Sequence, residues 1–312
     1  MTTAIITHEA CLGHETPEGH PERAARLTAV LKALKTEEFQ RLVWIEAPEA
    51  PRGLLERAHS PGLVGFVLDE AAAWATKGFV GIDSDTVMST GSAKAALHAA
   101  GAVVRAVDGV IAGEFANAFC PIRPPGHHAE RDRAMGFCLF NNVAVGAMRA
   151  RDAYKLSRIA VIDFDVHHGN GTQDIFFDDP ALFYASSHQS PLYPGTGRSS
   201  ERGVAGNILN VPLPPGADGA ALRIAFNDAI LPALRSFGPE LIFISAGFDA
   251  HRADPLAEMF LDEADFHWAT AQICRVAKDC CGGRVVSALE GGYDLDALAH
   301  SASAHVRALL EA

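Results

Sequence analysis

Aspartate and histidine side chains that could bind a metal ion collect in one short segment of the chain. Residues 163–173 read DFDVHHGNGTQ and follow an apolar run rich in Val and Ile. In an extended chain, residues two apart point to the same side, so Asp163, Asp165 and His167 are expected to share a face. Carboxylates and an imidazole on one face are typical ligands of a divalent cation. The segment therefore predicts a metal site.

Of these three, Asp165 and His167 can both reach one cation. A third ligand is expected from the segment SAGFDAH, where Asp249 follows another apolar run. Asp165, His167 and Asp249 would give two carboxylates, one imidazole and an open position, which is the form of a catalytic metal site. This set suits zinc, and Fe(II), Mn or Co would also fit its oxygen and nitrogen ligands. A lone Asp-x-His would more often be a capping Asp beside a solvated His. The prediction therefore depends on what the other segments place nearby.

Two further segments carry groups that could move or hold a proton. In RPPGHHAE, His127 and His128 follow a Pro-Pro-Gly sequence that restricts the backbone. In LEGGYDL, Tyr293 follows two glycines that permit a tight turn. Adjacent histidines on a loop are usually only polar, and Tyr293 could equally be a buried residue with one hydrogen bond. Four such segments, each at the end of an expected strand, favour a functional role for all of them.

The elements that must position these groups alternate along the chain. Continuous apolar runs predict strands buried on both faces of a parallel sheet, and the longer amphipathic runs between them predict helices. The expected strands are 4–7, 118–121, 158–164, 182–187, 208–211, 241–245 and 284–289; the expected helices are 21–36, 92–112, 139–151, 218–236, 262–280 and 294–311. This alternation predicts a three-layer α/β domain that binds its ligand at the carboxyl ends of the strands. Residues 1–312 contain no evident linker, so we expect a single domain.

Local signals set some of the expected boundaries. Pro21 with Glu22 suits the first turn of a helix, and Ser92 before an alanine-rich run suits a helix cap. Gly282 and Gly283 are expected to end the helix at 262–280. The stretch 188–206 is expected to form a long loop.

The bulk composition narrows the class of protein. The 26 basic and 38 acidic residues give a formal charge of −12, which argues against direct nucleic-acid binding and is compatible with a cationic substrate. The six cysteines form no Cys-x-x-Cys pair, as expected for reduced thiols. We expect no leader peptide and no membrane span, since no apolar run approaches the ~20 residues that a span needs. These features predict a cytoplasmic protein, and its compact size suggests a bacterial one.

Seven segments together resemble the histone deacetylase-like family, and the likeness is closest to its class II members, including bacterial histone deacetylase-like amidohydrolases. The segments, in the family's order, are GHPERAAR, RPPGHHAE, GFCLFNN, DFDVHHGNGTQ, HQSPLYPGTG, SAGFDAH and LEGGYDL. The resemblance extends from residue 19 to about residue 300. It implies an arginase/deacetylase-like fold, in which a central parallel eight-stranded sheet is flanked by helices and the metal lies at the strand ends.

The resemblance also implies a role for each matching residue. The zinc ligands would be Asp165, His167 and Asp249. His128 would be the general base and then the general acid, with Asn170 as its partner where many class I members have Asp. The other implied catalytic residues are His127 with its partner Asp163, and Tyr293, which would polarise the substrate carbonyl. The implied tunnel residues are Gly136, Phe137, Tyr193 and Leu256, and a structural potassium would lie at Asp163, Asp165, His167, Ser186 and Ser187.

The expected activity is that of a zinc-dependent amidohydrolase that removes acetyl, or other acyl, groups from lysine side chains or similar amines. Its partners would be an acetylated lysine peptide or a small acylated amine, and an oligomer is possible. The alternative is an acetylpolyamine amidohydrolase. Polyamine-specific relatives can carry Glu where this chain has Leu256, which cannot pair with a second amine. Two other readings are an arginase-like hydrolase, which would need two metals, and a binding module without catalysis.

Overall fold

The computed structural model describes residues 2–312 and is built around an eight-stranded sheet in which every neighbouring pair of strands is parallel. The strand order is β2-β1-β5-β10-β9-β6-β7-β8. The strands are β1 (Thr3–Thr7), β2 (Val43–Glu46), β5 (Asn117–Cys120), β6 (Ile159–Asp163), β7 (Leu182–Gln189), β8 (Ile208–Leu213), β9 (Leu241–Ala246) and β10 (Val285–Leu289). The predicted eight-stranded parallel sheet is therefore confirmed.

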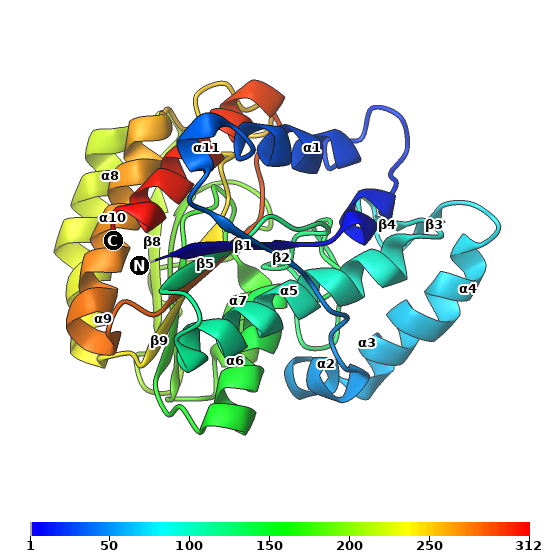
Figure 1. The fold of residues 1–312 in the computed structure, drawn as a ribbon, viewed down its shortest axis with the longest axis horizontal. Helices are drawn as coiled ribbons and strands as arrows, with labels where there is room; N and C mark the ends of the chain where they lie inside the picture. Colours follow the sequence, from blue (N-terminus) through cyan, green and yellow to red (C-terminus); the bar gives the residue numbers. More distant parts are fainter. Residues whose placement is uncertain (1) are drawn as a thin grey trace.

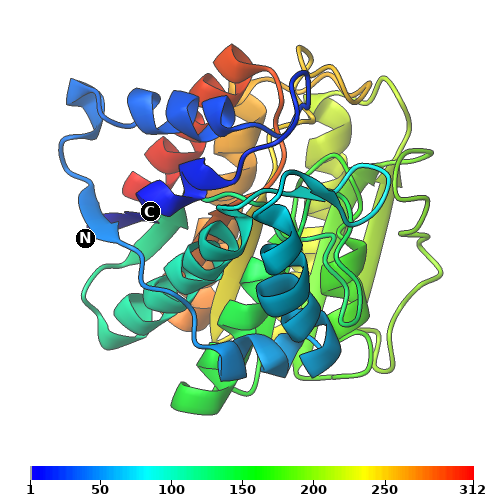
Figure 2. The same ribbon diagram turned by 90° about the vertical axis from the view of Figure 1, so that its right-hand side faces the viewer.

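Helices cover both faces of this sheet. Figure 1 shows α1 and α8 to α11 on one side and α5 to α7 on the other, and Figure 2 shows the same layers after a quarter turn. The main helices are α1 (Ala24–Ala33), α5 (Ser92–Ala112), α6 (Asn142–Tyr154), α7 (Asn170–Phe176), α8 (Gly219–Ala225), α9 (Leu231–Phe237), α10 (Glu263–Cys281) and α11 (Leu295–Leu310). The smaller elements are α2 (Arg52–Ala58), α3 (Pro61–Gly65), α4 (Ala72–Ala75), a two-stranded antiparallel pair of β3 (Val80–Gly81) and β4 (Val87–Met88), two 3₁₀ turns (Glu9–Gly13 and Glu37–Phe39) and two π-helical turns (Phe66–Ala71 and Phe226–Ile230).

The apolar core consists of two clusters, one on each face of the sheet. Strand residues alternate between them: Ala4 and Ile6 of β1 lie in the cluster under α5 and α6, whereas Ile5 lies in the cluster under α10 and α11. This alternation follows from the two-residue period of a strand. It explains why the central strands read as continuous apolar runs, because both faces are buried.

Several predicted boundaries were wrong, for identifiable reasons. The first helix begins at Ala24 and not at Pro21, because the Glu22 carboxylate is buried in ion pairs with Arg26 and Arg123. Ser92 is the first residue of α5 and not its cap; its hydroxyl instead accepts from the Ser89 amide at 2.7 Å, in the loop before the helix.

Among the other predicted elements, one helix is divided, one helix end is confirmed and one strand was missed. The helix predicted at 218–236 is divided by the π-helical turn Phe226–Ile230. Gly282 ends α10 in the left-handed conformation with φ of 64°, as expected. The edge strand β2 was not predicted, although it contains a short apolar run, VWI; its residues are largely exposed, as expected at the edge of a sheet.

One helix tests the expectation that no segment is apolar enough to span a membrane. Within residues 2–312, only α5 is long and apolar enough to cross a membrane, judged by length and composition alone. The relevant window of α5 is 72% buried inside the protein, where the helix packs against α6 and β5. A buried core helix passes the same test, so this property is weak evidence for a span.

Candidate active site

The four segments singled out by their chemistry follow four strands that are adjacent in the sheet. The strands β5, β10, β9 and β6 are consecutive neighbours, and they lead into the segments that carry His127, Tyr293, Asp249 and Asp165. All neighbouring pairs are parallel, so their carboxyl ends lie at one edge. The fold thus brings together the groups that the sequence places up to 166 residues apart, from His127 to Tyr293.

The three expected metal ligands form one buried cluster. Ligand atoms of Asp165, His167 and Asp249 all lie within 4.8 Å of one another, and His167 Nδ1 is 3.1 Å from an oxygen of each carboxylate. Backbone amides of Val166 and Gly291 donate to the two carboxylates at 2.9 and 2.8 Å and fix their orientation. Burial alone would lower the pKa of His167, but the two carboxylates outweigh it and raise this pKa to about 10. The cluster therefore favours positive charge at its centre.

The first of the tandem histidines is held by carboxylates. His127 Nδ1 lies 3.0 Å from Asp163 Oδ2, and its ring is stacked at a tilt against His128 with centroids 4.0 Å apart. Burial alone would lower the pKa of His127, but Asp165 and Asp163 outweigh it and hold the pKa well above its usual value. His127 is therefore suited to carry a positive charge.

The second histidine has a different environment, in which the neutral ring is favoured. Burial, together with the charges on His127 and His167, holds the pKa of His128 well below its usual value. Its Nδ1 lies 2.8 Å from Asn170 Oδ1. The Asn170 amide group donates to Glu130 Oε1 at 2.7 Å, which fixes the amide oxygen towards the ring. Nδ1 of His128 therefore carries the hydrogen, and Nε2 is left as a base.

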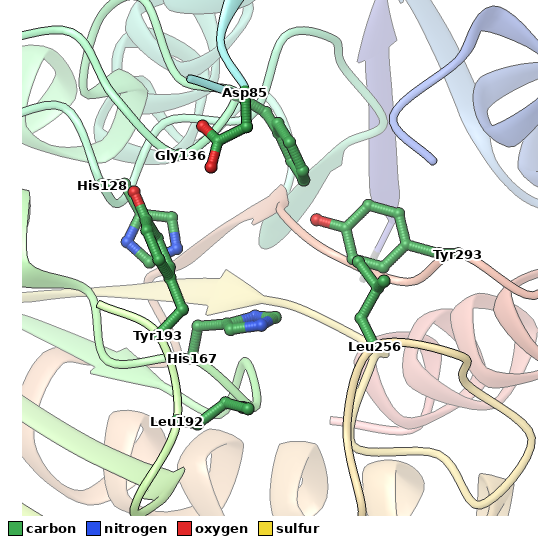
Figure 3. Close-up of a pocket in the computed structure, with 9 residues that line it drawn as sticks. Asp85, His128, Gly136, His167, Leu192, Tyr193, Leu256 and Tyr293 are labelled. Carbon is green, nitrogen blue, oxygen red and sulfur yellow. The ribbon is translucent and has the colours of Figure 1, made fainter. Parts of the chain in front are cut away.

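Tyr293 faces these histidines from the opposite side of the same pocket. Figure 3 shows its hydroxyl directed into the space in front of His128 and His167. The Tyr293 amide donates to Asp254 Oδ2 at 2.7 Å, and the Arg26 guanidinium lies 4.8 Å from the centre of the ring. Burial raises the pKa of Tyr293 well above its usual value, so the hydroxyl keeps its proton. Tyr293 is thus a fixed hydrogen-bond donor.

A pocket of about 230 Å³ leads down to this group of residues. It is lined by Asp85, His128, Gly136, Phe137, His167, Leu192, Tyr193, Leu256 and Tyr293. A side chain at Gly136 would lie 2.5 Å from the His128 ring, so only glycine fits at this wall. The four residues expected in the tunnel all line the pocket, whereas Asp163 and Asn170 are outside the lining and contact the two histidines.

Sequence reasoning did not single out several residues of the site. Asp85 and Leu192 line the pocket, Glu130 orients Asn170 and Asp254 holds the Tyr293 amide. Glu130 lies in a segment already marked by its histidines, which was a usable signal. Asp85 carries no comparable signal, because it lies in a short polar stretch far from the other segments in the sequence.

The residues expected at a potassium site overlap with the metal cluster, because Asp165 and His167 belong to both sets. Asp163 and Ser186 are register partners in the neighbouring strands β6 and β7. The Ser187 hydroxyl is buried without a hydrogen-bond partner among the described residues. His168 Nδ1 lies 2.8 Å from Thr196 Oγ1, and its Nε2 lies 3.0 Å from Gln173 Oε1 of α7, so both of its ring nitrogens have a hydrogen-bond partner.

The match to known families covers this whole arrangement. The histone deacetylase domain matches residues 20–309, which include the four strand ends and the side chains of the site. This chain belongs to the histone deacetylase family. Membership confirms the family resemblance carried by the sequence motifs, and it makes the chain a deacetylase-type hydrolase domain.

Relatives of this histone deacetylase family member are found in plants and archaea. It is 41% identical over 324 residues to histone deacetylase 14, chloroplastic, of Arabidopsis thaliana, an alignment that covers 98% of this chain and 76% of the relative. It is 38% identical to a probable deacetylase of Archaeoglobus fulgidus, covering 95% and 82%. The crystal structure of the HDA15 HD domain matches with a TM-score of 0.92 at 36% identity, covering 99% of this chain and 88% of that one. The fold is therefore the arginase/deacetylase fold.

Proposed function

We propose that this chain is a zinc-dependent amidohydrolase that removes acetyl groups from lysine side chains or similar acylated amines. The observation that supports this most directly is the meeting of three kinds of group in one pocket. The cluster of Asp165, His167 and Asp249 lies beside a neutral histidine, His128, and opposite the Tyr293 hydroxyl. Amide hydrolysis by a metal-activated water uses a Lewis acid, a proton carrier and an oxyanion donor, and these groups could supply all three.

The donor set of the cluster fits a single zinc ion. Asp165, His167 and Asp249 would hold it and leave a position open for water and substrate. A bound zinc would polarise the acyl carbonyl and lower the pKa of a water molecule. Within residues 2–312 no second group of three such ligands meets the same distance limit, which disfavours the two-metal arginase-like alternative.

The side chains around the cluster divide the proton and charge chemistry between them. Because Asn170 holds Nδ1 of His128, Nε2 is available to take a proton from the attacking water. The same nitrogen then returns that proton to the leaving amine. The Tyr293 hydroxyl would donate to the carbonyl oxygen as negative charge develops on it. His127, paired with Asp163, would add positive charge close to the forming oxyanion.

The walls of the pocket fit an unbranched aliphatic chain that carries the acyl amide to its floor. Phe137 and Tyr193 give aromatic faces, and Leu192 and Leu256 add apolar surface. Burying the methylene groups of a lysine side chain against these walls would be favourable by roughly 0.8 kcal/mol for each group. These features support an acylated lysine or a similar amine as the substrate.

Acetylated polyamines are the alternative substrate class, and one observation favours them. Asp85 lines the pocket mouth in Figure 3, where its carboxylate could pair with a second amine of the substrate. Leu256 argues the other way, since an ammonium buried beside an apolar side chain loses its hydration without gaining a partner. Both residues line the same pocket, and we propose that Leu256 decides the preference.

Leu256→Glu is expected to shift substrate preference towards acetylated polyamines. A partly buried carboxylate would give the second amine a charge-assisted partner worth about 1.5 kcal/mol, so kcat/KM for acetylspermidine relative to an acetyl-lysine peptide should rise about tenfold. Leu256→Gln is the matched control, because it has the same shape as Glu without the charge. Equal shifts in both variants would show that size rather than charge sets the preference and would contradict this assignment.

A side-by-side rate comparison tests the proposed function. Release of the free amine is measured from an acetyl-lysine peptide, from acetylspermidine and from a longer acyl-lysine peptide, with acetate as the second product of the first two. We expect the acetyl-lysine peptide to have a higher kcat/KM than acetylspermidine. If the wild-type enzyme prefers acetylspermidine, the protein is instead an acetylpolyamine amidohydrolase. Failure to release acetate from either acetylated substrate would contradict deacetylation.

We also propose that a structural potassium ion lies beside the zinc site. Two observations support this: Asp163 and Ser186 are adjacent across β6 and β7, and the buried Ser187 hydroxyl has no protein partner among the described residues. Oxygen atoms of this kind are typical ligands of hard cations.

A further inference from the structure

Glu290 is a fully buried carboxylate that none of the chemistry above uses. It follows β10 directly and has no exposed surface. Its own amide donates to Ala246 O of β9 at 3.0 Å, and its carbonyl accepts from Arg26 Nη2 at 2.6 Å. The backbone of Glu290 is therefore fixed from two sides, and its side chain has a fixed origin.

The side chain of Glu290 reaches the loop that carries the tandem histidines. Its Oε2 accepts from the Gly126 amide at 2.6 Å and from the His127 amide at 3.1 Å. Its Oε1 accepts from the Ser245 hydroxyl at 3.0 Å. One carboxylate thus connects β10, the end of β9 and two consecutive amides of the loop after β5.

These two amides fix the backbone on which both histidine side chains are placed. The carbonyl of His127 accepts from the amides of Gly171 and Thr172 at 3.0 and 3.1 Å, at the start of α7. The N–H of His127 is held by Glu290, so His127 is held at both ends. A side chain at Gly126 would lie 2.6 Å from the Asn142 amide, which leaves the turn little room to adjust.

We infer that Glu290 is a positioning residue that sets the placement of His127 and His128 through the backbone of their loop. This inference rests on the proposed function. Without the carboxylate, two buried amides would lose their acceptor and the loop would shift to find new partners. A shift of about 1 Å in a proton carrier costs about 10²-fold in rate, whereas the metal ligands and the walls formed by Phe137, Tyr193 and Leu256 would stay in place.

Two variants separate the reach of this side chain from its charge. Glu290→Asp keeps the charge but is one methylene shorter, so it would fail to reach both amides. Glu290→Gln loses the charge but keeps the reach, since its carbonyl oxygen can accept from both amides. A positioning role predicts that kcat of Glu290→Asp falls about 10²-fold and that kcat of Glu290→Gln stays within about fivefold of wild type.

The experiment measures kcat and KM on an acetyl-lysine peptide, metal content and thermal melting for wild type and both variants. Ser245→Ala is the matched control, because it removes the third hydrogen bond of Glu290 and leaves the two amide bonds intact. We expect KM within about threefold of wild type in every variant, one metal per chain, and near wild-type kcat for Ser245→Ala. This split between kcat and KM is a result that a purely structural role would not give.

Four results would overturn the inference or its basis. A Glu290→Asp enzyme as active as wild type would remove the positioning role, and so would equal losses in Glu290→Asp and Glu290→Gln. Unfolding or metal loss in both variants would assign Glu290 to stability alone. An inactive wild type in the same assay would instead overturn the proposed function and, with it, this role.

Discussion

A His128→Ala enzyme is expected to lose about 10²–10⁴-fold in kcat on an acetyl-lysine peptide, the usual contribution of a positioned proton carrier. Burial and nearby positive charge keep His128 neutral, and Asn170 leaves its Nε2 free. His127 is a poor substitute, because its pKa is raised and Asp163 engages its Nδ1. The loss should appear mainly in kcat, since the aromatic and apolar walls formed by Phe137, Tyr193 and Leu256 stay in place when the ring is removed.

The control for this variant is the substitution of a histidine that lies outside the active site. The side chain of His300 is 71% exposed, so His300→Ala should keep wild-type rates. Metal content of His128→Ala should also match that of wild type, because His128 is not one of the three ligands. Wild-type kcat in His128→Ala would assign the proton transfer to another group.

Replacing Tyr293 with Phe is expected to lower kcat about 10²–10³-fold, the typical cost of losing one oxyanion donor. The hydroxyl faces the pocket from the side opposite His128 (Figure 3), and burial keeps it protonated. Phe keeps the ring and its packing against Phe137, whose centroid lies 5.9 Å away. Binding of a metal-chelating inhibitor should therefore weaken far less than kcat falls.

Tyr154→Phe is the matched control, because it removes a hydroxyl that donates to Asp108 at 2.9 Å and does not line the pocket. It should have wild-type kcat. If Tyr293→Phe lost inhibitor affinity and kcat to the same extent, the hydroxyl would act in ground-state binding, and its role as a transition-state donor would be wrong.

The sequence predicted best where several constraints coincide. Apolar runs buried on both faces marked the central strands, and chemistry-bearing residues directly after four of them marked one edge of the sheet. Asp165, His167 and Asp249 were expected together and form one cluster. The roles assigned to these residues and to His128 and Tyr293 remain predictions, as do the cytoplasmic location and the single-domain organisation.

The supporting residues of the site were harder to predict, because each acts through backbone atoms of a distant loop. The Glu290 carboxylate accepts hydrogen bonds from two backbone amides that lie 163 and 164 residues earlier in the chain. The Asp254 carboxylate accepts a hydrogen bond from a backbone amide 39 residues later. Amides leave no pattern in the sequence, so nothing identifies their acceptors. Glu22 shows the same limit: it was expected at a helix start, but its carboxylate is buried against two arginines that only the fold brings close.

The central claim is that one metal ion at Asp165, His167 and Asp249 is required for amide hydrolysis. The most direct test removes metal from the wild-type protein with a chelator, returns zinc in steps, and measures bound metal by elemental analysis and acetate release on the same samples. We predict no turnover in the metal-free protein, and a rate that rises in proportion to bound zinc and levels off at one ion per chain. Full turnover in protein shown to be free of metal, or a rate that needs two zinc ions per chain, would contradict the account.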